Sequence, residues 1–389
     1  MQTKPLTQTQ NQTQNQTAGA DRSSRYIYLA SPWTPVCGGI YKVVDYLVQS
    51  QASEQPANAA HLRPLDTRSG GPAVFSAWFL FVALLRIIMG RISGRLAGVH
   101  VNVAERLSLI RKGTIVVLCK AIGVPVVVHL HAQMKSFYHR VPGPFRWFAR
   151  WVFNAADGVV VLGPSAHKFV LEDLGVPPER VELVYNGVPE PMAARREFDP
   201  HGVRNVLFLG RLDKLKGVSD LIAAVAQPGF DRERLCVKVA GGGDIAAYEA
   251  EARALGVDDI VKFQGMCDQA QVASLLAQAD VLVLPSYDEV LPLVILEALA
   301  NGVAVICTPV GEVSAVLTDN LNTRFIKPGD VPGIARELQA VLADRELMAA
   351  LGNNGRALYD QHFSLARYFA GIAKMHQRCF GVSATAGKA

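Results

Sequence analysis

Short apolar runs alternate with longer, helix-like stretches along this chain, and the alternation begins again near residue 204. The runs RYIYLASP (25–32) and VPVVVHLHA (124–132) represent the first half, and RNVLFLG (204–210) and ADVLVLPS (279–286) represent the second. Strands that alternate with helices favour parallel α/β sheets. At 389 residues the chain is also too long for one ordinary core. The pattern therefore predicts an α/β fold of two Rossmann-like, doubly wound domains that face a central cleft.

The two domains are expected at 25–188 and 189–363, with a further helix at 364–380. A Gln/Thr/Asn-rich stretch with almost no charge precedes them at 1–24, and this composition is typical of a disordered tail. In doubly wound sheets, ligands bind beyond the carboxyl ends of the strands. The loops that follow the predicted strands are therefore the places where functional residues are expected.

One such loop lies in the segment YDEVLPLVILEALANG (287–302), which follows a short buried strand. Pro292 suits the first turn of a helix because its missing N–H would have no partner there. The segment thus places Glu289 in the loop and Glu297 about one turn inside the helix. The helix N-terminus favours a phosphate, whereas the two carboxylates favour hydroxyl groups, as on a sugar or ribose. This combination indicates a nucleotide sugar as ligand.

Basic and glycine-rich loops follow other predicted strands. Arg211 comes directly after a buried strand, and Lys216 stands where the next helix begins. Arg can grip a diphosphate through two N–H groups, and Lys adds a mobile positive charge, although two solvated basic residues would have the same pattern. Gly38 and Gly39 would let the backbone approach a phosphate closely. Each of these patterns is weak alone, since tight turns use paired glycines constantly.

The stretch VVVHLHAQ (126–133) ends a strand with two histidines, His129 and His131. Residues two apart on a strand share one face, so at least one of these rings is expected at the cleft. No metal site is predicted, because no carboxylate cluster stands nearby and the chain contains no Asp-x-Asp. The six cysteines form no CxxC pair, which predicts neither zinc nor disulfides and favours a reducing cytoplasm.

The first half of the chain is the basic half. Between Arg86 and Arg150 there are 11 Lys or Arg and a single acid, Glu105. No aromatic-interleaved or helix-turn-helix pattern supports nucleic acid as a partner, so an anionic membrane surface or a phosphate-bearing acceptor fits better. The apolar run AVFSAWFLFVALLRIIM (73–89) is too short to span a bilayer. It is expected either to pack on the sheet or to lie on a membrane surface.

Taken together, these motifs resemble the retaining glycosyltransferases of family 4, which have the two-domain GT-B fold. The resemblance runs from about Arg25 to about Phe369 and is strongest between Asn205 and Leu317. It implies that Glu297 holds the ribose hydroxyls and that Glu289 holds those of the donor sugar. It also implies that the helix at 364–380 crosses back to the first domain.

The resemblance assigns the remaining donor contacts residue by residue. Arg211 and Lys216 would neutralise the diphosphate in place of a metal, and Gly38 and Gly39 would form the phosphate loop of the first domain. His131 matches the active-site histidine, although Ala132 replaces the usual glycine after it. The base would dock at FQGMC (263–267), against Gly265 and Met266. Because Pro292 lacks an N–H, the neighbouring residues Leu291 and Leu293 would supply the phosphate contacts.

The acceptor side resembles polysaccharide-assembly members of the family around Asn102, Ser108, Arg111 and Lys112. The last two would contact an acceptor diphosphate. The implied reaction transfers a hexose, with retention, from a nucleotide diphosphate sugar to a polyprenyl-diphosphate saccharide or a glycolipid. It would take place on the cytoplasmic face of the cell membrane, in exopolysaccharide or other cell-surface polysaccharide synthesis, without a cofactor. A nucleotide-sugar epimerase or hydrolase, or a catalytically inactive partner subunit, remains an alternative.

Overall fold

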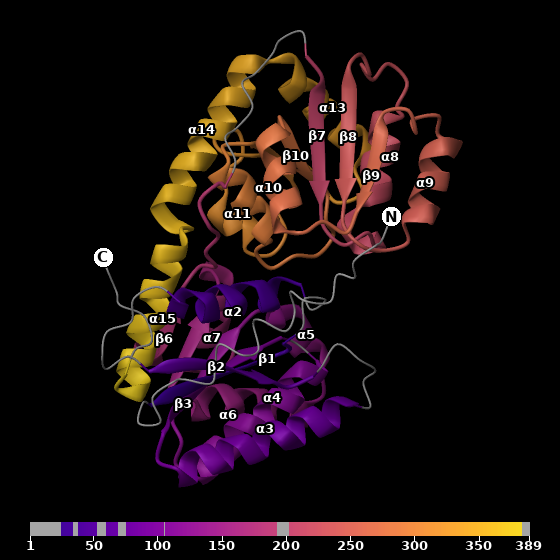
Figure 1. The fold of residues 1–389 in the computed structure, drawn as a ribbon. Helices are drawn as coiled ribbons and strands as arrows, with labels where there is room; N and C mark the ends of the chain where they lie inside the picture. Colours follow the sequence, from indigo (N-terminus) through magenta and orange to yellow (C-terminus); the bar gives the residue numbers. More distant parts are fainter. Residues whose placement is uncertain are drawn as a thin grey trace, which may run out of the picture.

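The structure is a computed structural model that describes residues 25–33, 38–52, 60–68, 75–104, 106–192 and 202–382. The tail expected at 1–24 lies outside the described residues. Two six-stranded parallel sheets follow one another along the chain, each covered by helices (Figure 1). This arrangement confirms the predicted α/β fold of two doubly wound sheets.

The first sheet has the order β2-β1-β3-β4-β5-β6. Its strands are β1 (Tyr26–Ser31), β2 (His61–Asp66), β3 (Leu96–Val103), β4 (Val126–Leu130), β5 (Gly158–Val161) and β6 (Val181–Leu183). The helices around it are α2 (Gly39–Gln49), α3 (Phe75–Ile92), α4 (Leu107–Ala121), α5 (Met134–Arg140), α6 (Gly143–Ala155) and α7 (Pro164–Glu172). Short 3-10 turns lie at Ser50–Ala52 and Pro178–Arg180.

The second sheet has the order β12-β11-β10-β7-β8-β9. Its strands are β7 (Arg204–Leu209), β8 (Leu235–Ala240), β9 (Val261–Gly265), β10 (Val281–Leu284), β11 (Ala304–Cys307) and β12 (Arg324–Phe325). Its helices are α8 (Val218–Val225), α9 (Ile245–Ala254), α10 (Gln269–Gln278), α11 (Leu293–Ala300), α12 (Val313–Val316), α13 (Val331–Ala343) and α14 (Arg345–His362). A 3-10 turn at Lys214–Lys216 precedes α8.

The strand order of the second sheet determines where a ligand can bind. Read from β9 it is the third, second, first, fourth, fifth and sixth strand of the domain, so the winding direction reverses between β7 and β10. Ligands of such sheets bind beyond the carboxyl ends of the strands at this reversal. The loop after β7 carries Arg211 and the loop after β10 carries Glu289. Both predicted ligand loops thus flank the switch point.

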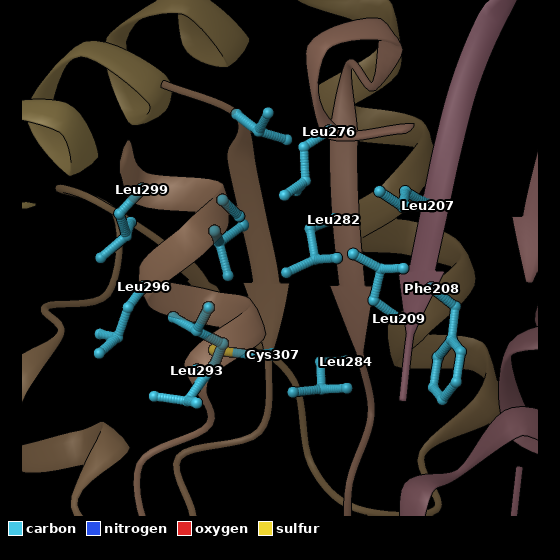
Figure 2. Close-up of a cluster of buried hydrophobic side chains, with 14 of the residues drawn as sticks. Leu207, Phe208, Leu209, Leu276, Leu282, Leu284, Leu293, Leu296, Leu299 and Cys307 are labelled. Atoms are coloured by element: carbon cyan, nitrogen blue, oxygen red, sulfur yellow. The ribbon is translucent and has the colours of Figure 1, made fainter. Parts of the chain in front are cut away.

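The core of the second domain holds these loops in place. Figure 2 shows leucines of β7, β10 and α11 in one cluster of buried side chains, together with Phe208 and Cys307. Helix α11 is apolar on all sides, as expected for a fully buried helix. Its single charged residue is Glu297, which is 7% exposed. A buried carboxylate is costly unless it has a partner, so its presence in this helix points to a function.

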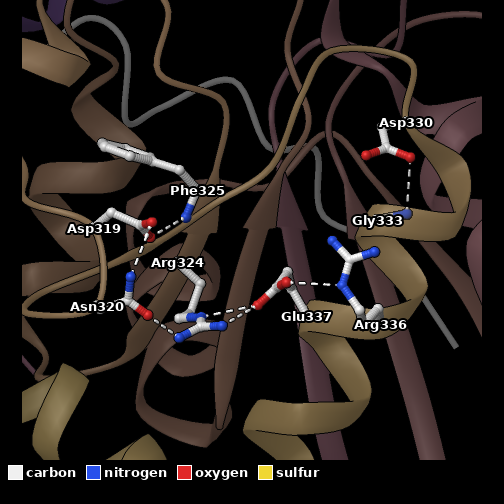
Figure 3. Close-up of polar contacts among 8 residues, drawn as sticks. All are labelled: Asp319, Asn320, Arg324, Phe325, Asp330, Gly333, Arg336 and Glu337. Atoms are coloured by element: carbon white, nitrogen blue, oxygen red, sulfur yellow. Dashed lines mark hydrogen bonds and ion pairs between the residues drawn. The ribbon is translucent and has the colours of Figure 1, made fainter.

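Polar contacts close the far edge of the second sheet. The Arg324 guanidinium of β12 donates to the Glu337 carboxylate of α13 at 2.5 and 2.9 Å, and Arg336 donates to the same carboxylate (Figure 3). The Asp330 carboxylate accepts from the Gly333 N–H at 3.0 Å and caps the start of α13. These contacts attach the two-residue strand β12 to the helix that follows it.

Helix α15 (Leu365–Phe380) packs on the first sheet, against β3, β4 and β5. It follows the long helix α14, and Figure 1 shows the pair running down one side of the molecule from the second domain to the first. Two glycines let α15 approach the strands closely. A Cβ on Gly98 would lie 2.3 Å from a ring atom of Phe380, and one on Gly158 would lie 2.5 Å from the Met375 sulfur.

Two features of the first domain add to the sequence analysis. The strand β2 escaped prediction because its Pro64 weakens the sequence signal, and Pro is tolerated here because β2 is an edge strand. Residues 75–89 of the apolar run form most of α3, which packs against β2 and β3 as the first of the two alternatives expects, whereas contact with a membrane surface stays a prediction. Ala83 and Ile87 are buried, whereas Trp78, Phe81 and Met89 are more than half exposed.

Candidate active site

A cavity of about 390 Å³ lies between the two domains. The first domain lines it with residues of the loops after β3 and β4 and of α5, among them Arg106 and His131. The second domain contributes Asp288, Glu289 and Val290 from the loop after β10. The structure therefore brings together His131 and Glu289, which are 158 residues apart in the sequence.

Lys216 pairs with the cavity residue Glu289. Its Nζ lies 2.5 Å from Oε1 of Glu289, and the same oxygen accepts from the Ser286 hydroxyl at 3.1 Å. The two loops meet this closely because Gly217 has a φ of +70° and a Cβ there would lie 2.3 Å from the Pro285 carbonyl oxygen. The carboxylate predicted to bind sugar hydroxyls is thus paired with the ammonium group predicted to bind phosphate.

Arg211 extends away from this pair. Its side chain is 77% exposed, and its Nε donates to the Asp213 carboxylate at 2.9 Å. Its position after β7 matches the sequence prediction, but its guanidinium pairs with Asp213 rather than with Glu289. An exposed Arg at the switch point is free to turn toward a diphosphate, because a guanidinium held only by a surface ion pair loses little by moving.

Two helix N-termini face each other across the domains. Gly38, with a φ of +70°, precedes α2, and a Cβ on Gly39 would lie 3.7 Å from a methyl group of Leu293. Pro292 occupies the N-cap of α11, one position earlier than predicted, and no side chain caps this helix. Leu291 and Leu293 are only 5% and 9% exposed as whole residues. Backbone N–H groups at such a helix start are the groups that a phosphate would meet.

Glu297 lies at a second, smaller cavity of about 40 Å³, next to Tyr46 and Asn301. Its Oε1 forms an ion pair with the Lys42 ammonium of α2, in the first domain. Its Oε2 is buried without a hydrogen-bond partner. A buried carboxylate oxygen without a donor is costly, so it is suited to accept hydrogen bonds from an incoming hydroxyl. The pKa of the Tyr46 hydroxyl is raised by burial and by the negative charge of Glu297.

The predicted base-binding residues lie at the end of β9. Gly265 has a φ of +70°, which few other residues adopt, and it turns the chain out of the strand. Met266 is 74% exposed, and a Cβ on Gly242 would lie 2.6 Å from its sulfur. Its flexible thioether therefore covers the glycine loop after β8 and offers an apolar surface to a flat ring.

His131 is the only one of the two predicted histidines that lines the large cavity. Strand β4 ends at Leu130, and the rings of His129 and His131 are adjacent, with centroids 4.0 Å apart. The Nε2 of His131 lies 2.9 Å from Oδ1 of Asn102. Burial, and secondly the Lys112 ammonium, lower the pKa of His131 to about 3. The imidazole is therefore neutral over the whole physiological pH range.

The expectation for Lys112 is wrong. It was predicted as a surface residue that meets an acceptor diphosphate, but it is 1% exposed. Its ammonium donates to the Asn102 carbonyl oxygen inside the domain. Arg111 is half-buried, and the pKa of its guanidinium is lowered by burial and by the nearby Arg68. Both residues lie within α4 rather than at its start, which is why adjacent positions point to different environments.

Comparisons with known proteins identify the family of the chain. The family described as "Glycosyltransferase Family 4" matches residues 63–190, and "Glycosyl transferases group 1" matches residues 194–358. The chain belongs to the family 4 glycosyltransferases. It is 31% identical to the D-inositol 3-phosphate glycosyltransferase of Streptomyces bingchenggensis over 246 aligned residues. The alignment covers 58% of this chain and 53% of the relative. The chain thus spans about half the length of the curated relatives it matches.

Solved structures share the GT-B fold of this glycosyltransferase family member over nearly its whole length. The sucrose-phosphate synthase of Thermosynechococcus elongatus has a TM-score of 0.74 at 19% identity, and the match covers 92% of this chain and 99% of the synthase chain. Alr3699/HepE of Anabaena, solved in complex with UDP, has a TM-score of 0.69 at 16% identity, covering 90% and 98%. At these identities the likeness establishes the fold alone.

Several contacts of this family 4 chain across the cleft escaped the sequence analysis. The Glu312 carboxylate accepts from the N–H groups of Ser165 and Ala166, at 2.9 and 2.6 Å, at the start of α7. The Gln133 amide donates to the Glu289 carbonyl oxygen, and Lys42 pairs with Glu297. Among the described residues, no group of three or more His, Cys, Asp and Glu side chains has the geometry to hold a metal ion.

Proposed function

We propose that this protein is a retaining glycosyltransferase that moves a hexose from a nucleotide diphosphate sugar to a lipid-linked saccharide or glycolipid. The observation that carries the proposal is Glu289, which lines the interdomain cavity together with His131 and pairs with Lys216. A carboxylate for hydroxyls and an ammonium for phosphate, side by side at a switch point, match the two halves of a sugar diphosphate. UDP in the related fold of Alr3699/HepE supports the same ligand class.

The proposed mechanism depends on stabilising the leaving diphosphate. Negative charge grows on the phosphate oxygen as the sugar bond breaks, and Lys216, Arg211 and the start of α11 supply fixed positive charge there. Glu289 holds the sugar hydroxyls, and its side chain is only 12% exposed, which strengthens those hydrogen bonds. His131, with a pKa of about 3, is a weak base, so it positions a hydroxyl rather than removing its proton. The leaving phosphate then accepts the acceptor's proton.

A thermal-shift screen tests the donor half of the proposal. UDP, GDP and ADP sugars are each added to the full chain, and the rise in melting temperature is recorded. A ligand at about 100 times its Kd stabilises the folded state by about 2.7 kcal/mol. We expect one base to give the largest shift, followed by transfer of its sugar in a radiolabel assay. The absence of a shift with all three bases contradicts the proposed donor class.

Glu297 and Glu289 are expected to separate nucleotide binding from sugar transfer. Glu297→Ala removes the proposed acceptor of the ribose hydroxyls, so the Kd for the free nucleoside diphosphate should rise about tenfold, consistent with about 1–3 kcal/mol for such bonds. Glu289→Gln is the matched control, because a nucleotide without its sugar lacks the hydroxyl groups that Glu289 is proposed to hold. Calorimetric titration checks both variants. Wild-type nucleotide affinity in Glu297→Ala would refute the ribose role.

We further propose that the first domain binds the cytoplasmic surface of an anionic membrane, where its lipid-linked acceptor is found in cell-surface polysaccharide synthesis. Helix α3 exposes Trp78, Phe81, Leu85, Met89 and Ile92 at helical spacing along one face. The neighbouring helix α4 exposes Leu107 and Ile110. No helix among the described residues is long and apolar enough to cross a bilayer. An apolar stripe on the helix that also exposes Arg86 and Arg91 suits the membrane interface.

Flotation with liposomes tests this surface. The wild-type chain should float with vesicles of anionic lipid at low salt and be released as salt rises, because the attraction is screened. Trp78→Ser with Ile92→Ser should abolish flotation, since both side chains are exposed on α3. The control is Leu255→Ser with Leu321→Ser, which removes exposed apolar side chains from the second domain. Equal flotation of the two double variants would contradict membrane binding through α3.

A further inference from the structure

Four buried histidines form a connected cluster behind the interdomain cavity. Nε2 of His376, on α15, lies 2.8 Å from Nδ1 of His100 on β3. Nε2 of His100 lies 3.2 Å from Nδ1 of His129 on β4. The ring of His129 packs against that of His131, which lines the cavity. The cluster thus runs from the last helix of the chain, through two strands, to the candidate active site.

The geometry of the first sheet explains how these rings meet. His100 and Asn102 are two residues apart on β3 and therefore share one face of the sheet. His129 is the register partner of Asn102 on the neighbouring strand. Helix α15 covers the same face and delivers His376, whose ring also stacks on Phe380 with centroids 5.2 Å apart. The small residue Gly98 allows this approach.

The cluster carries no charge at neutral pH. His100, His129 and His376 are at most 1% exposed, and His131 is 8% exposed. Burial lowers the pKa of His100 to about 3 and holds the pKa values of His129 and His376 well below the usual range. A neutral imidazole has one N–H and one lone pair. His100 bonds through both of its nitrogens, so it donates with one and accepts with the other.

The hydrogen bond to Asn102 determines the tautomer of His131. An amide oxygen only accepts, so Nε2 of His131 must carry the proton that it donates to Oδ1 of Asn102. The Lys112 ammonium holds the backbone of Asn102 from the other side. Nδ1 of His131 then keeps its lone pair and has no hydrogen-bond partner among the described residues. It is the nitrogen that could accept a hydrogen bond from a hydroxyl in the cavity.

We propose that His376, His100 and His129 are positioning residues that hold the ring of His131 in place, as its Nε2–H tautomer, for a substrate hydroxyl. The hydrogen bonds from His376 to His100 and from His100 to His129 orient the His129 ring. The ring of His131 packs against it. Asn102 then selects the nitrogen that faces the ligand. The inference rests on the proposed function for its catalytic consequence, but the state of the His131 ring is measurable without turnover.

The first test reads the His131 tautomer by ¹⁵N NMR of the full chain labelled at histidine, with His131→Gln used for assignment. In the wild type, the signals of His131 should be those of a proton on Nε2 and a bare Nδ1, unchanged between about pH 5.5 and 8. His376→Phe keeps a ring of similar size but removes the bond to His100. In this variant the His131 signals should move toward an average of the two tautomers.

Kinetics separates positioning from a merely structural role. His376→Phe should lower kcat by about tenfold to 100-fold with little change in the donor KM, as expected for a misplaced group that acts in the transition state. His376→Gln, whose amide can still bond to His100, should recover most of the loss. Met375→Leu, at the neighbouring buried position of α15, is the control and should match the wild type in both measurements.

Two results would overturn the inference. One is a wild-type His131 that carries its proton on Nδ1, which needs no variant to observe. The other is a His376→Phe protein whose His131 signals and kcat equal those of Met375→Leu. If no nucleotide sugar supports turnover, the proposed function fails, and the NMR comparison alone still decides whether α15 holds the His131 ring.

Discussion

Replacing Lys216 by Ala is expected to lower kcat/KM by more than about 100-fold, because removing one fixed group that stabilises developing charge typically costs this much. Lys216 contacts Glu289 in the cavity and would meet the diphosphate as it leaves. Arg211→Ala should also reduce turnover by well over tenfold, although its exposed side chain must first move to the ligand. Initial rates over a range of donor concentrations check both variants.

The control for this prediction is Lys262→Ala, which removes an exposed ammonium from β9 at a distance from the cavity residues. It should retain wild-type rates. If Lys216→Ala remained within about threefold of the control, Lys216 would not stabilise the leaving group. Adding EDTA to the wild type should change nothing, since Lys216, Arg211 and the start of α11 are proposed to supply the positive charge. Activity that disappeared with chelator and returned with Mg²⁺ or Mn²⁺ would contradict that account.

The alternation of strands and helices sufficed to predict the fold, because a buried strand, a loop and an amphipathic helix each leave a local pattern. The loops that flank the switch point were predictable for the same reason. Glu289, Arg211 and Lys216 stand just beyond strand ends, and parallel strands bring their carboxyl ends to one edge. The strand β2 was missed because Pro64 contradicts the local pattern, while its edge position makes the proline harmless.

Contacts between distant segments could not be predicted in this way. Lys42 pairs with Glu297 across the two domains, and Glu312 caps α7 from the opposite domain. Each of these residues looks like a solvated charge in its own segment. The same limit explains Lys112, which a charge count places at the surface. Its helix turns it inward instead, where the Asn102 carbonyl oxygen accepts from it.

The histidine cluster is the clearest case of information that appears only in the fold. His100 and His376 are 276 residues apart and meet because α15 returns to the first sheet. Nothing in the local sequence around either residue distinguishes it from a surface histidine. Because the folded state keeps these rings neutral, their burial should make the protein less stable in acid.

Lowering the pH from about 6.5 toward 5 should destabilise this protein steeply. The four rings bind protons in the unfolded chain near their ordinary pKa of about 6.5, but burial depresses the pKa in the folded state, to about 3 for His100 and His131. Above pH 6.5 neither state is protonated, so the full stability is present. Below it the unfolded state gains protons, and stability is lost progressively until the folded pKa is reached.

The expected size of this effect is large. Each histidine contributes up to about 1.4 kcal/mol per pH unit in this window, so four of them approach about 5 kcal/mol per unit. That is comparable to the whole stability of a typical domain. The charged or titratable side chains that act on the rings are Lys112 of α4 and the rings themselves. The Lys112 ammonium opposes protonation of His131 and so adds to the effect.

Variants can assign the acid sensitivity to the cluster. His376→Phe removes one buried ring, so the slope of the unfolding free energy against pH should fall by about one proton between pH 6 and 5. Met375→Leu, at the neighbouring buried position of α15, changes no titratable group and should leave the slope unchanged. Both variants keep every carboxylate of the chain, so the difference between the two slopes isolates the buried ring. Urea unfolding at several pH values measures it, and equal slopes in the two variants would mean that His376 is not buried as a neutral ring.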